Sequence, residues 1–331
     1  MDLLSEVVIN STTHYVSDEW HQLTRLYEPK IASYTPVRYG LPVVYGGFAK
    51  PKWGDRSFLP DLFDGTDWPP PKTITVTDKL TETTEAAAIT VFAGTLHLAS
   101  YNETEVVYTP HGEEYTATIA DSTALSGTLA SIFTTYCGAT HLNLTLDTTD
   151  ARGTTPTITY TTSGEQMTID VLSDLAAYCT HCFYIKGTTL YLVDMLAGDD
   201  NSYSLDEFGY FMGSEYRAQQ PVSLIKGTDT SSNERSVDGS YQYGEELTVD
   251  IYDNNQTRVE TELGNIKTLV EKDYYRFRVI PESDKLPTIG EVITVTNESL
   301  QESTTVEFIV TDYAPDIFGQ EIMIEGIGAE V

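Results

Sequence analysis

The sequence predicts a mainly β protein in which two antiparallel β-barrel domains flank a small α+β insertion. Residues 73–108 and 274–325 alternate between apolar and polar positions, which is typical of strands with one solvent-exposed face. Residues 122–195 contain two stretches in which apolar residues recur three and four positions apart, which is typical of helices. The length of 331 residues, 40% of them hydrophobic, favours two or three domains with real cores.

The charge and composition exclude several classes of protein. The chain carries 50 acidic and 19 basic residues, a net charge of −31, which disfavours binding to nucleic acid or to an anionic membrane through charge. No apolar run approaches the ~20 residues of a membrane-spanning helix, and the first residues lack the pattern of a signal peptide. Three cysteines do not make a disulfide framework. We therefore expect folding in a cytoplasm, with the cysteines as free thiols.

The first third of the chain is predicted to hold an arm and the first barrel. Residues 1–34 form an N-terminal arm, which either docks on a neighbouring subunit or is a loosely packed terminus. Residues 35–112 form the first β-barrel domain. Within it, residues 51–71 are rich in proline, glycine and aromatic residues and make a long loop that packs on its own domain or in an interface. Short strands follow at 73–77, 88–92, 95–98 and 105–108, with a turn at Ala93-Gly94.

The predicted α+β insertion, residues 113–200, contains one helix and strand unit twice. Helices are expected within 125–137 and 171–182, since apolar residues recur with the helical period in both. Strands are expected at 113–119, 141–146, 183–185 and 189–193. Neither helix can bury its apolar stripe alone, so we expect the two helices to cover one small sheet.

The remaining residues, 201–331, are predicted to form the second β-barrel domain. Residues 227–239 are polar enough to be a mobile loop, and a short helix is expected within 260–270. The other segments alternate and are expected as strands, at 223–226, 249–252, 274–279, 291–295, 305–310 and 320–325.

Several packing motifs resemble those of a known family. A strand reading Leu-Pro-Thr-Ile-Gly-Glu-Val-Ile-Thr-Val from Leu286, a strand ending Phe-Ile-Val-Thr-Asp-Tyr at Tyr313, and a closing Glu-Ile-Met-Ile-Glu strand resemble the last barrel of tailed-phage baseplate hub proteins. The unit from Leu172 to Ile185, followed by Gly-Thr-Thr-Leu-Tyr-Leu-Val at 187–193, is similar to the helix and strand pair inserted between the two barrels of those hubs. Phage hubs and type VI secretion spike proteins share this order of barrel, α+β insertion and barrel.

This resemblance implies a non-enzymatic hub that forms a ring, most often a homotrimer, between the tail tube and the tip or spike. Two barrels per chain let three chains present six similar units to a hexameric tube. A channel lined by carboxylates repels DNA phosphates, so the genome passes without specific binding. The implied partners are the tube or distal tail protein and the tip, spike or fibre protein. The implied location is the virion tail, assembled in the host bacterial cytoplasm without membrane insertion.

Other interpretations stay open. An acidic surface also keeps a protein soluble. The chain could be a distal tail or receptor-binding adaptor that contacts host-surface glycan, since its 22 tyrosines suit protein interfaces and sugar stacking, although tyrosine is also an ordinary strand residue. A tail-associated cell-wall hydrolase is a third alternative. The sequence lacks a nucleophile elbow, H-E-x-x-H, a P-loop and a glycine-rich dinucleotide motif, so no catalytic or cofactor-binding residue is predicted.

The most specific candidate for chemistry in the sequence is the set of three cysteines, Cys137, Cys179 and Cys182. If the two helix and strand units are repeats, Cys137 and Cys179 occupy equivalent helix ends and Cys182 lies one turn further on. Three thiolates, with His141 or His181 as a fourth ligand, could hold zinc or an iron–sulfur cluster, and some phage tail-tip proteins carry such a cluster. A free cysteine among leucine and alanine is otherwise core filling. We expect no cofactor or metal, with the cluster or zinc as the alternative.

Overall fold

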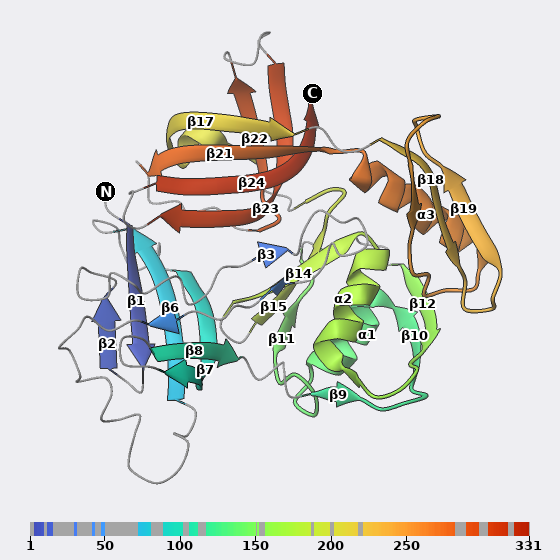
Figure 1. Cartoon of the computed structure of the whole chain (residues 1–331), viewed down its shortest axis with the longest axis horizontal. Helices are drawn as coiled ribbons and strands as arrows, with labels where there is room; N and C mark the ends of the chain where they lie inside the picture. The colour runs from blue at the N-terminus through green and yellow to red at the C-terminus, as the bar shows by residue number, and fades with distance from the viewer. Residues whose placement is uncertain are drawn as a thin grey trace.

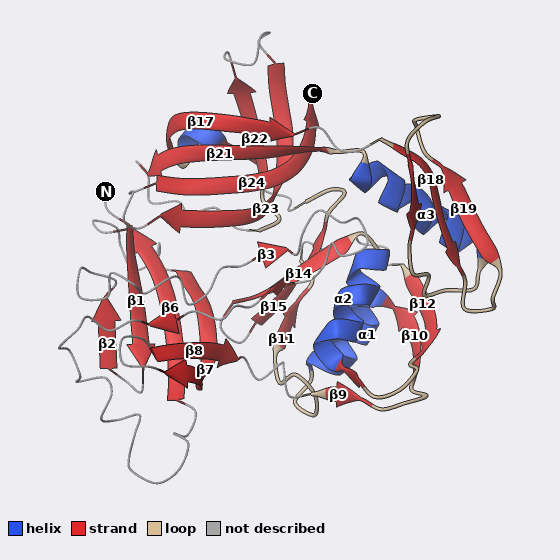
Figure 2. Ribbon diagram, viewed as in Figure 1, coloured by secondary structure: helices blue, strands red, loops and turns tan. Residues whose placement is uncertain are grey.

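The computed structural model describes the amino-terminal part of the chain by the backbones of its strands and the rest with most side chains. The described residues are 3–9, 12–15, 30–31, 42–43, 48–49, 72–80, 89–101, 106–111, 117–149, 151, 156–186, 189–198, 202–217, 221–281, 289–297, 304–316 and 321–330. Two sheets, a compact helix and strand insertion and a smaller unit at the right make up the molecule (Figure 1). Strands dominate, and the long helices lie in the insertion and in the smaller unit (Figure 2). The predicted fold class, mainly β with an α+β insertion, is confirmed.

The first sheet is antiparallel and has six strands in the order β2-β1-β6-β7-β8-β5. Its strands are β1 (Leu3–Ile9), β2 (Thr12–Tyr15), β5 (Phe48–Ala49), β6 (Lys72–Leu80), β7 (Ile89–Tyr101) and β8 (Val106–His111). Strand β1 pairs with β6 over its whole length, from Leu3 opposite Leu80 to Ile9 opposite Ile74. The prediction of a separate arm is therefore wrong for residues 3–9 and 12–15, because β1 pairs with the distant strand β6 and β2 pairs with β1.

The predicted turn at Ala93-Gly94 is also wrong. Both residues lie inside the ladder of β7, with Ala93 opposite Thr75 and Gly94 opposite Ile74. A glycine in a strand weakens it locally, but pairing with β6 on one side and β8 on the other keeps β7 continuous. The long loop predicted at 51–71 lies outside the described residues.

Two short strands from the same part of the chain join the second sheet instead. Strand β3 (Lys30–Ile31) pairs with β4 (Pro42–Val43), and Lys30 is opposite Asp312 of β23 (Thr304–Asp316). The range predicted for the first barrel, 35–112, therefore also contributes to the second sheet.

The described residues of the insertion form two helices and three small sheets. Its elements are β9 (Thr118–Ile119), β10 (Ala124–Thr128), α1 (Leu129–Cys137), β11 (Thr145–Asp147), β12 (Thr157–Thr161), β13 (Gln166–Met167), α2 (Thr168–Tyr178), β14 (His181–Lys186) and β15 (Thr189–Asp194). The sheets are β11-β15-β14, β10-β12 and β13-β9. Helix α1 begins later than predicted, because residues 124–128 pair with β12 and the Thr128 side chain caps the helix by accepting a hydrogen bond from the Ser131 backbone N–H at 3.2 Å.

The two helices pack against each other and against the sheet β11-β15-β14, as predicted (Figure 1). Phe133 of α1 meets Phe183 of β14 edge to face, with ring centroids 5.3 Å apart, and both side chains are fully buried. Leu172 and Leu175 of α2 belong to the same core. Full burial of each such side chain stabilises the fold by about 1.5–3 kcal/mol, which explains why helix and strand in each unit form together.

The second sheet curves into half of a barrel (Figure 1). Its order is β16-β22-β23-β24-β21-β17, with β16 parallel to β22 and antiparallel pairs elsewhere along this path. The elements are β16 (Ser202–Ser204), the short helix η5 (Leu205–Glu207), β17 (Gly209–Arg217), β21 (Asp273–Pro281), β22 (Val292–Asn297) and β24 (Glu321–Glu330). Phe277 and Phe308 stack at 5.0 Å in its core. A Cβ at Gly326 would lie 2.2 Å from the Phe308 ring, so this strand needs glycine there.

Residues 222–270 form a smaller unit inserted between β17 and β21, which the prediction of one barrel over 201–331 missed. Its elements are β18 (Val222–Thr228), β19 (Glu234–Asp238), β20 (Glu245–Thr248) and α3 (Gln256–Val270), with sheet order β19-β18-β20. The predicted mobile loop at 227–239 is therefore wrong, because it contains most of a β-hairpin. The predicted strand at 249–252 is also wrong, since these residues have no strand pairing in the described part of the chain, whereas the predicted short helix is confirmed as α3. No helix among the described residues is long and apolar enough to cross a membrane.

Candidate functional site

The three cysteines lie in the core of the insertion. Cys137 is the last residue of α1 and Cys179 follows the last residue of α2, so these two occupy matching helix ends as predicted. Cys182 lies in strand β14 and not on a further helical turn. All three are buried, form no disulfide and lie within one apolar cluster.

The two histidines considered as further ligands have other contacts. His181 is buried, and its Nδ1 lies 2.7 Å from the carbonyl oxygen of Cys179, so this ring nitrogen donates to the backbone. The His141 ring packs on the Tyr136 ring, with centroids 4.7 Å apart. Each histidine is therefore held by its own local partner.

The chemistry of the thiols matches a packing role. Burial raises the pKa of Cys137 to about 12 and also raises the pKa of Cys182, to which the Asp194 carboxylate adds. The thiolate is the form that binds metal, and it is disfavoured in such a site. Within the described residues, which include all five candidate ligands, no three His, Cys, Asp or Glu side chains group to hold a metal ion. Zinc or an iron–sulfur cluster at these residues therefore stays the alternative prediction, and core packing is the role that the contacts support.

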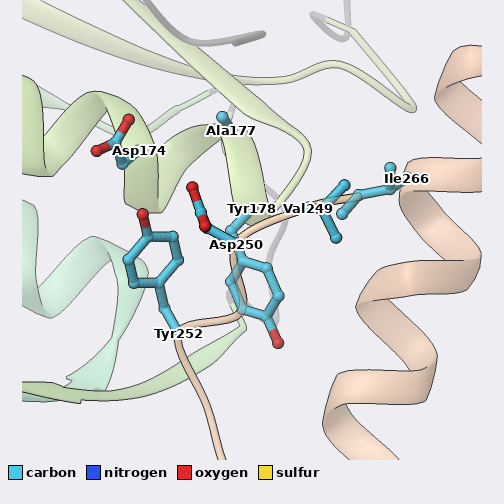
Figure 3. A pocket seen from close by; sticks show the side chains of 7 residues that line it. All are labelled: Asp174, Ala177, Tyr178, Val249, Asp250, Tyr252 and Ile266. Atoms are coloured by element: carbon cyan, nitrogen blue, oxygen red, sulfur yellow. The ribbon is translucent and has the colours of Figure 1, made fainter. Parts of the chain in front are cut away.

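A shallow cleft lies where α2 meets the segment that leads into α3 (Figure 3). It is open to solvent, measures about 270 Å³, and is lined by Asp174, Ala177, Tyr178, Val249, Asp250, Tyr252 and Ile266. The Tyr252 hydroxyl points toward the carboxylates of Asp174 and Asp250, whereas the Tyr178 hydroxyl points away from them (Figure 3). Burial, reinforced by these two carboxylates, raises the pKa of Tyr252.

The arrangement of this cleft favours a structural junction over a ligand site. The Tyr252 ring meets the rings of Tyr160 and Tyr178 edge on, at 4.9 and 5.8 Å. The backbone N–H of Thr159 also donates to the Tyr252 carbonyl oxygen at 2.9 Å. Small-molecule sites usually measure about 300–1,000 Å³ and enclose most of the ligand, whereas this cleft encloses a cavity of only about 20 Å³. Its aromatic residues bind the insertion to the unit that carries α3.

Exposed apolar side chains gather on the second sheet. Tyr210, Phe211 and Met212 of β17 and Ile280 of β21 form the β17 patch, with exposed fractions of 60%, 36%, 45% and 36%. Tyr210 and Ile280 are directly opposite in the ladder, so the patch is continuous across two strands. Contiguous exposed apolar side chains of this kind commonly mark a protein interface.

A groove of about 590 Å³ runs beside the β17 patch. It is lined by Ser204, Leu205, Asp206, Gly209, Tyr210, Phe211, Thr294, Val295 and Thr296, which belong to β16, η5, β17 and β22. The groove therefore separates the two ends of the half-barrel sheet. Sequence reasoning missed this region, although the run Tyr210-Phe211-Met212 carries a signal, since three successive large apolar residues cannot all face the core of a regular strand.

A second exposed aromatic pair lies on the turn between β19 and β20. Tyr241 is 53% exposed and Tyr243 is 94% exposed. The turn is held at its start by Glu271, which accepts hydrogen bonds from the backbone N–H and the hydroxyl of Ser240 at 2.8 and 2.9 Å. We call these two residues the tyrosine turn.

Comparisons with known proteins find similarity in structure and none in sequence. No protein-family model matches the sequence, and a search of curated proteins finds no match. The chain is similar to the 43 kDa tail protein of prophage MuSo2 from Shewanella oneidensis, with 12% identity, a TM-score of 0.54 and coverage of 98% of both chains. It is also similar to a tail protein from Neisseria meningitidis, with 8% identity, a TM-score of 0.58 and coverage of 99% of this chain and 96% of that one. The chain thus shares its whole-length fold with phage tail proteins.

Proposed function

We propose that this chain is a structural protein of a phage-type tail that acts as its hub, a homotrimeric ring that joins the tail tube to the tip or spike. The observation that carries the proposal is the likeness of its whole length to two tail proteins, including both sheets and the insertion between them. Because these proteins are only 8–12% identical to the chain, the fold supports the class of protein, and its role in the ring is inferred from the features below.

The layout of the two sheets supports a ring of three chains. Each sheet contains three consecutive antiparallel strands, β6-β7-β8 in the first and β22-β23-β24 in the second. The middle strand of each set has 13 residues and carries a register shift. Two comparable units per chain would give six in a trimer, which suits contact with a hexameric tube.

The charge of the chain supports a passage for DNA. A net charge of −31 on 331 residues makes the overall field of the protein repel DNA phosphates. We infer that carboxylates line the inner wall of the ring, so that the genome passes without specific binding. We also infer a non-enzymatic role, since both similar structures are tail proteins and the cleft at Tyr252 has the features of a packing junction.

The test is the position and copy number of the chain in purified particles. Quantitative mass spectrometry of intact particles should give three copies per particle, and electron microscopy with a tagged chain should place it at the end of the tail, around an axial channel. A single copy per particle, or a position away from the axis, would overturn the hub proposal. A chain missing from particles would overturn the tail role altogether.

A receptor-binding adaptor is the second candidate, and the tyrosine turn favours it. Two exposed tyrosines on a polar turn, Tyr241 and Tyr243, offer rings on which a sugar can stack. Binding of the isolated protein to a glycan array, lost in Tyr243→Ala, would support this role. Equal binding by Tyr243→Ala and the parent protein would exclude the tyrosine turn as a sugar site.

A further inference from the structure

The groove beside β17 is bordered by strand edges. Strand β17 ends the sheet path and pairs only with β21 in the described structure. On the opposite wall, β22 pairs with β23 on one side and with β16 on the other. The pairing with β16 ends at Thr294, so among the described strands none pairs with residues 295–296 on that second side. The backbone N–H and C=O groups along such an edge lack strand hydrogen bonds, and an added strand commonly supplies them.

A tight connection holds the two walls together. The chain passes from β16, on one wall, to β17, on the other, through η5, which lies within the curve of the sheet (Figure 2). A capping box holds η5, in which the Glu207 carboxylate accepts a hydrogen bond from the Ser204 backbone N–H at 3.0 Å. Leu205 and Phe208 are anchored in the core of the second sheet. This connection therefore joins the two walls through a short segment anchored in the core.

The side chains that border the groove are suited to an extended segment. Leu205 and Val295 are buried apolar residues that line it, while Tyr210, Phe211 and Met212 are exposed on its rim. The register shift between Phe211 and Gly213 makes Met212 an extra residue on β17. Such a bulge interrupts the alternation of faces, so neighbouring side chains can be exposed on the same side of the strand. An extended segment with apolar side chains at alternate positions could therefore contact both the residues that line the groove and those on its rim.

The charges at the groove indicate the source of the segment. Asp206 lines the groove, and the adjacent Glu207 adds a second carboxylate at the same end. Acidic residues outnumber basic ones by 50 to 19 in this chain, so a segment from a second copy would on average bring further negative charge to this place. A neutral or basic segment of a different protein fits the groove better.

We propose that this groove receives an extended segment of another tail protein, which adds as a strand along residues 209–213 of β17. The segment carries apolar residues at alternate positions and lysine or arginine near Asp206. This inference rests on the proposed tail role, because it names a neighbour in the tail as the partner. The added strand would narrow the gap in the half-barrel and join two proteins through backbone hydrogen bonds as well as side chains.

Crosslinking in intact particles tests the proposal. A photo-crosslinking amino acid replaces Tyr210, and a matched particle carries it at Tyr243 on the tyrosine turn. We expect position 210 to crosslink to one other tail protein, at an alternating apolar segment identified by mass spectrometry, and position 243 not to reach that segment. A crosslink from position 210 to a second copy, or within the same chain, would overturn the proposal.

Amide hydrogen exchange separates strand addition from contact through side chains alone. Backbone amides of residues 209–213 should be protected in particles relative to the isolated protein. A double variant, Tyr210→Asp with Met212→Asp, should enter particles about tenfold less than the parent, whereas Tyr243→Asp should enter normally. Unchanged thermal unfolding of the isolated double variant shows that its fold is intact.

The outcomes also separate this proposal from the hub proposal. A chain that is present in particles, but whose residues 209–213 exchange as fast as in the isolated protein, counts against the groove alone. A chain that never enters particles counts against both.

Discussion

Arg258, in the first turn of α3, holds the buried carboxylate of Asp253 with two hydrogen bonds, from Nε to Oδ2 at 2.5 Å and from Nη2 to Oδ1 at 2.7 Å. The Asp253 side chain is fully buried, and the backbone N–H groups of Asn254 and Asn255 also donate to it. Burial alone would raise the pKa of Asp253, but these hydrogen bonds outweigh it and hold the pKa below its ordinary value of 3.8. The pair fixes the segment that brings Tyr252 onto the insertion.

Replacement of Arg258 by methionine should destabilise the unit that carries α3. The change leaves a buried carboxylate without its two strongest donors, and the expected loss in free energy of unfolding is about 2 kcal/mol, measured by urea denaturation at neutral pH. Arg258→Lys should restore only part of the loss, since an ammonium cannot make the paired contact. The control is Arg278→Met, whose exposed guanidinium lies 3.7 Å from Glu321, with an expected change within about 0.5 kcal/mol.

The hairpin of β18 and β19 should weaken in acid because of Asp229. Its carboxylate accepts hydrogen bonds from the backbone N–H groups of Ser231 and Asn233, and from the Asn233 amide and the Arg235 guanidinium. Burial raises the pKa of Asp229, but these donors lower it to about 2, from an ordinary value of 3.8. The folded-state pKa is the lower one, so the stabilisation is complete above 3.8 and is lost as the pH falls toward 2.

Asp229→Asn provides the measurement. The variant should have a lower urea midpoint than the parent at neutral pH, and the difference should shrink between pH 4 and pH 2 as the parent loses its charged carboxylate. Asp238→Asn changes an exposed acid of the same hairpin and should lower the midpoint at neutral pH far less than Asp229→Asn does. A gap between Asp229→Asn and the parent that stays constant with pH would refute the role of the charge.

The sequence predicts those parts of the fold whose pattern is local. The helical period around Leu129 and Leu172 and the two-residue period of β21 to β24 both correspond to elements of the structure, since burial of one face is enough to specify them. The hairpin at 227–239 could not be found this way. Its alternating residues are polar, and Asp229 organises its turn through hydrogen bonds that no hydrophobic pattern reveals.

The candidate sites also differ in how much of them the sequence predicts. The cysteines were found by residue type alone, and their matching helix ends follow from the repeated pattern, but the helix end at Tyr178 places Cys182 on a strand, where it is one more core side chain. The groove beside β17 depends on which strands end the sheet path. Pairing between residues as distant as Tyr210 and Ile280 decides this, and it leaves no local signal beyond the exposed apolar run.

The three thiols should be protected until the insertion unfolds. Burial raises the pKa of Cys137 to about 12, so almost none of it is thiolate at neutral pH, and Cys182 is shifted in the same direction. Ellman's reagent should therefore react slowly with the native protein and with three thiols per chain in urea. Iron and zinc analysis of protein purified without oxygen should find no stoichiometric metal. Rapid loss of thiols from the native protein after chelation would instead support a metal site.

Two glycine substitutions in the α3 unit should have opposite signs. A Cβ at Gly227 of β18 would lie 2.3 Å from the Val249 carbonyl oxygen and 2.9 Å from the Ile251 side chain, so Gly227→Ala must push the segment before α3 away from the sheet. The expected loss in free energy of unfolding is about 1–3 kcal/mol. Gly264 lies within α3 and a Cβ there meets no atom within 4 Å, so Gly264→Ala should stabilise the unit by about 1 kcal/mol through helix propensity. Equal effects of the two variants on the urea midpoint would show that α3 and β18 do not pack as described.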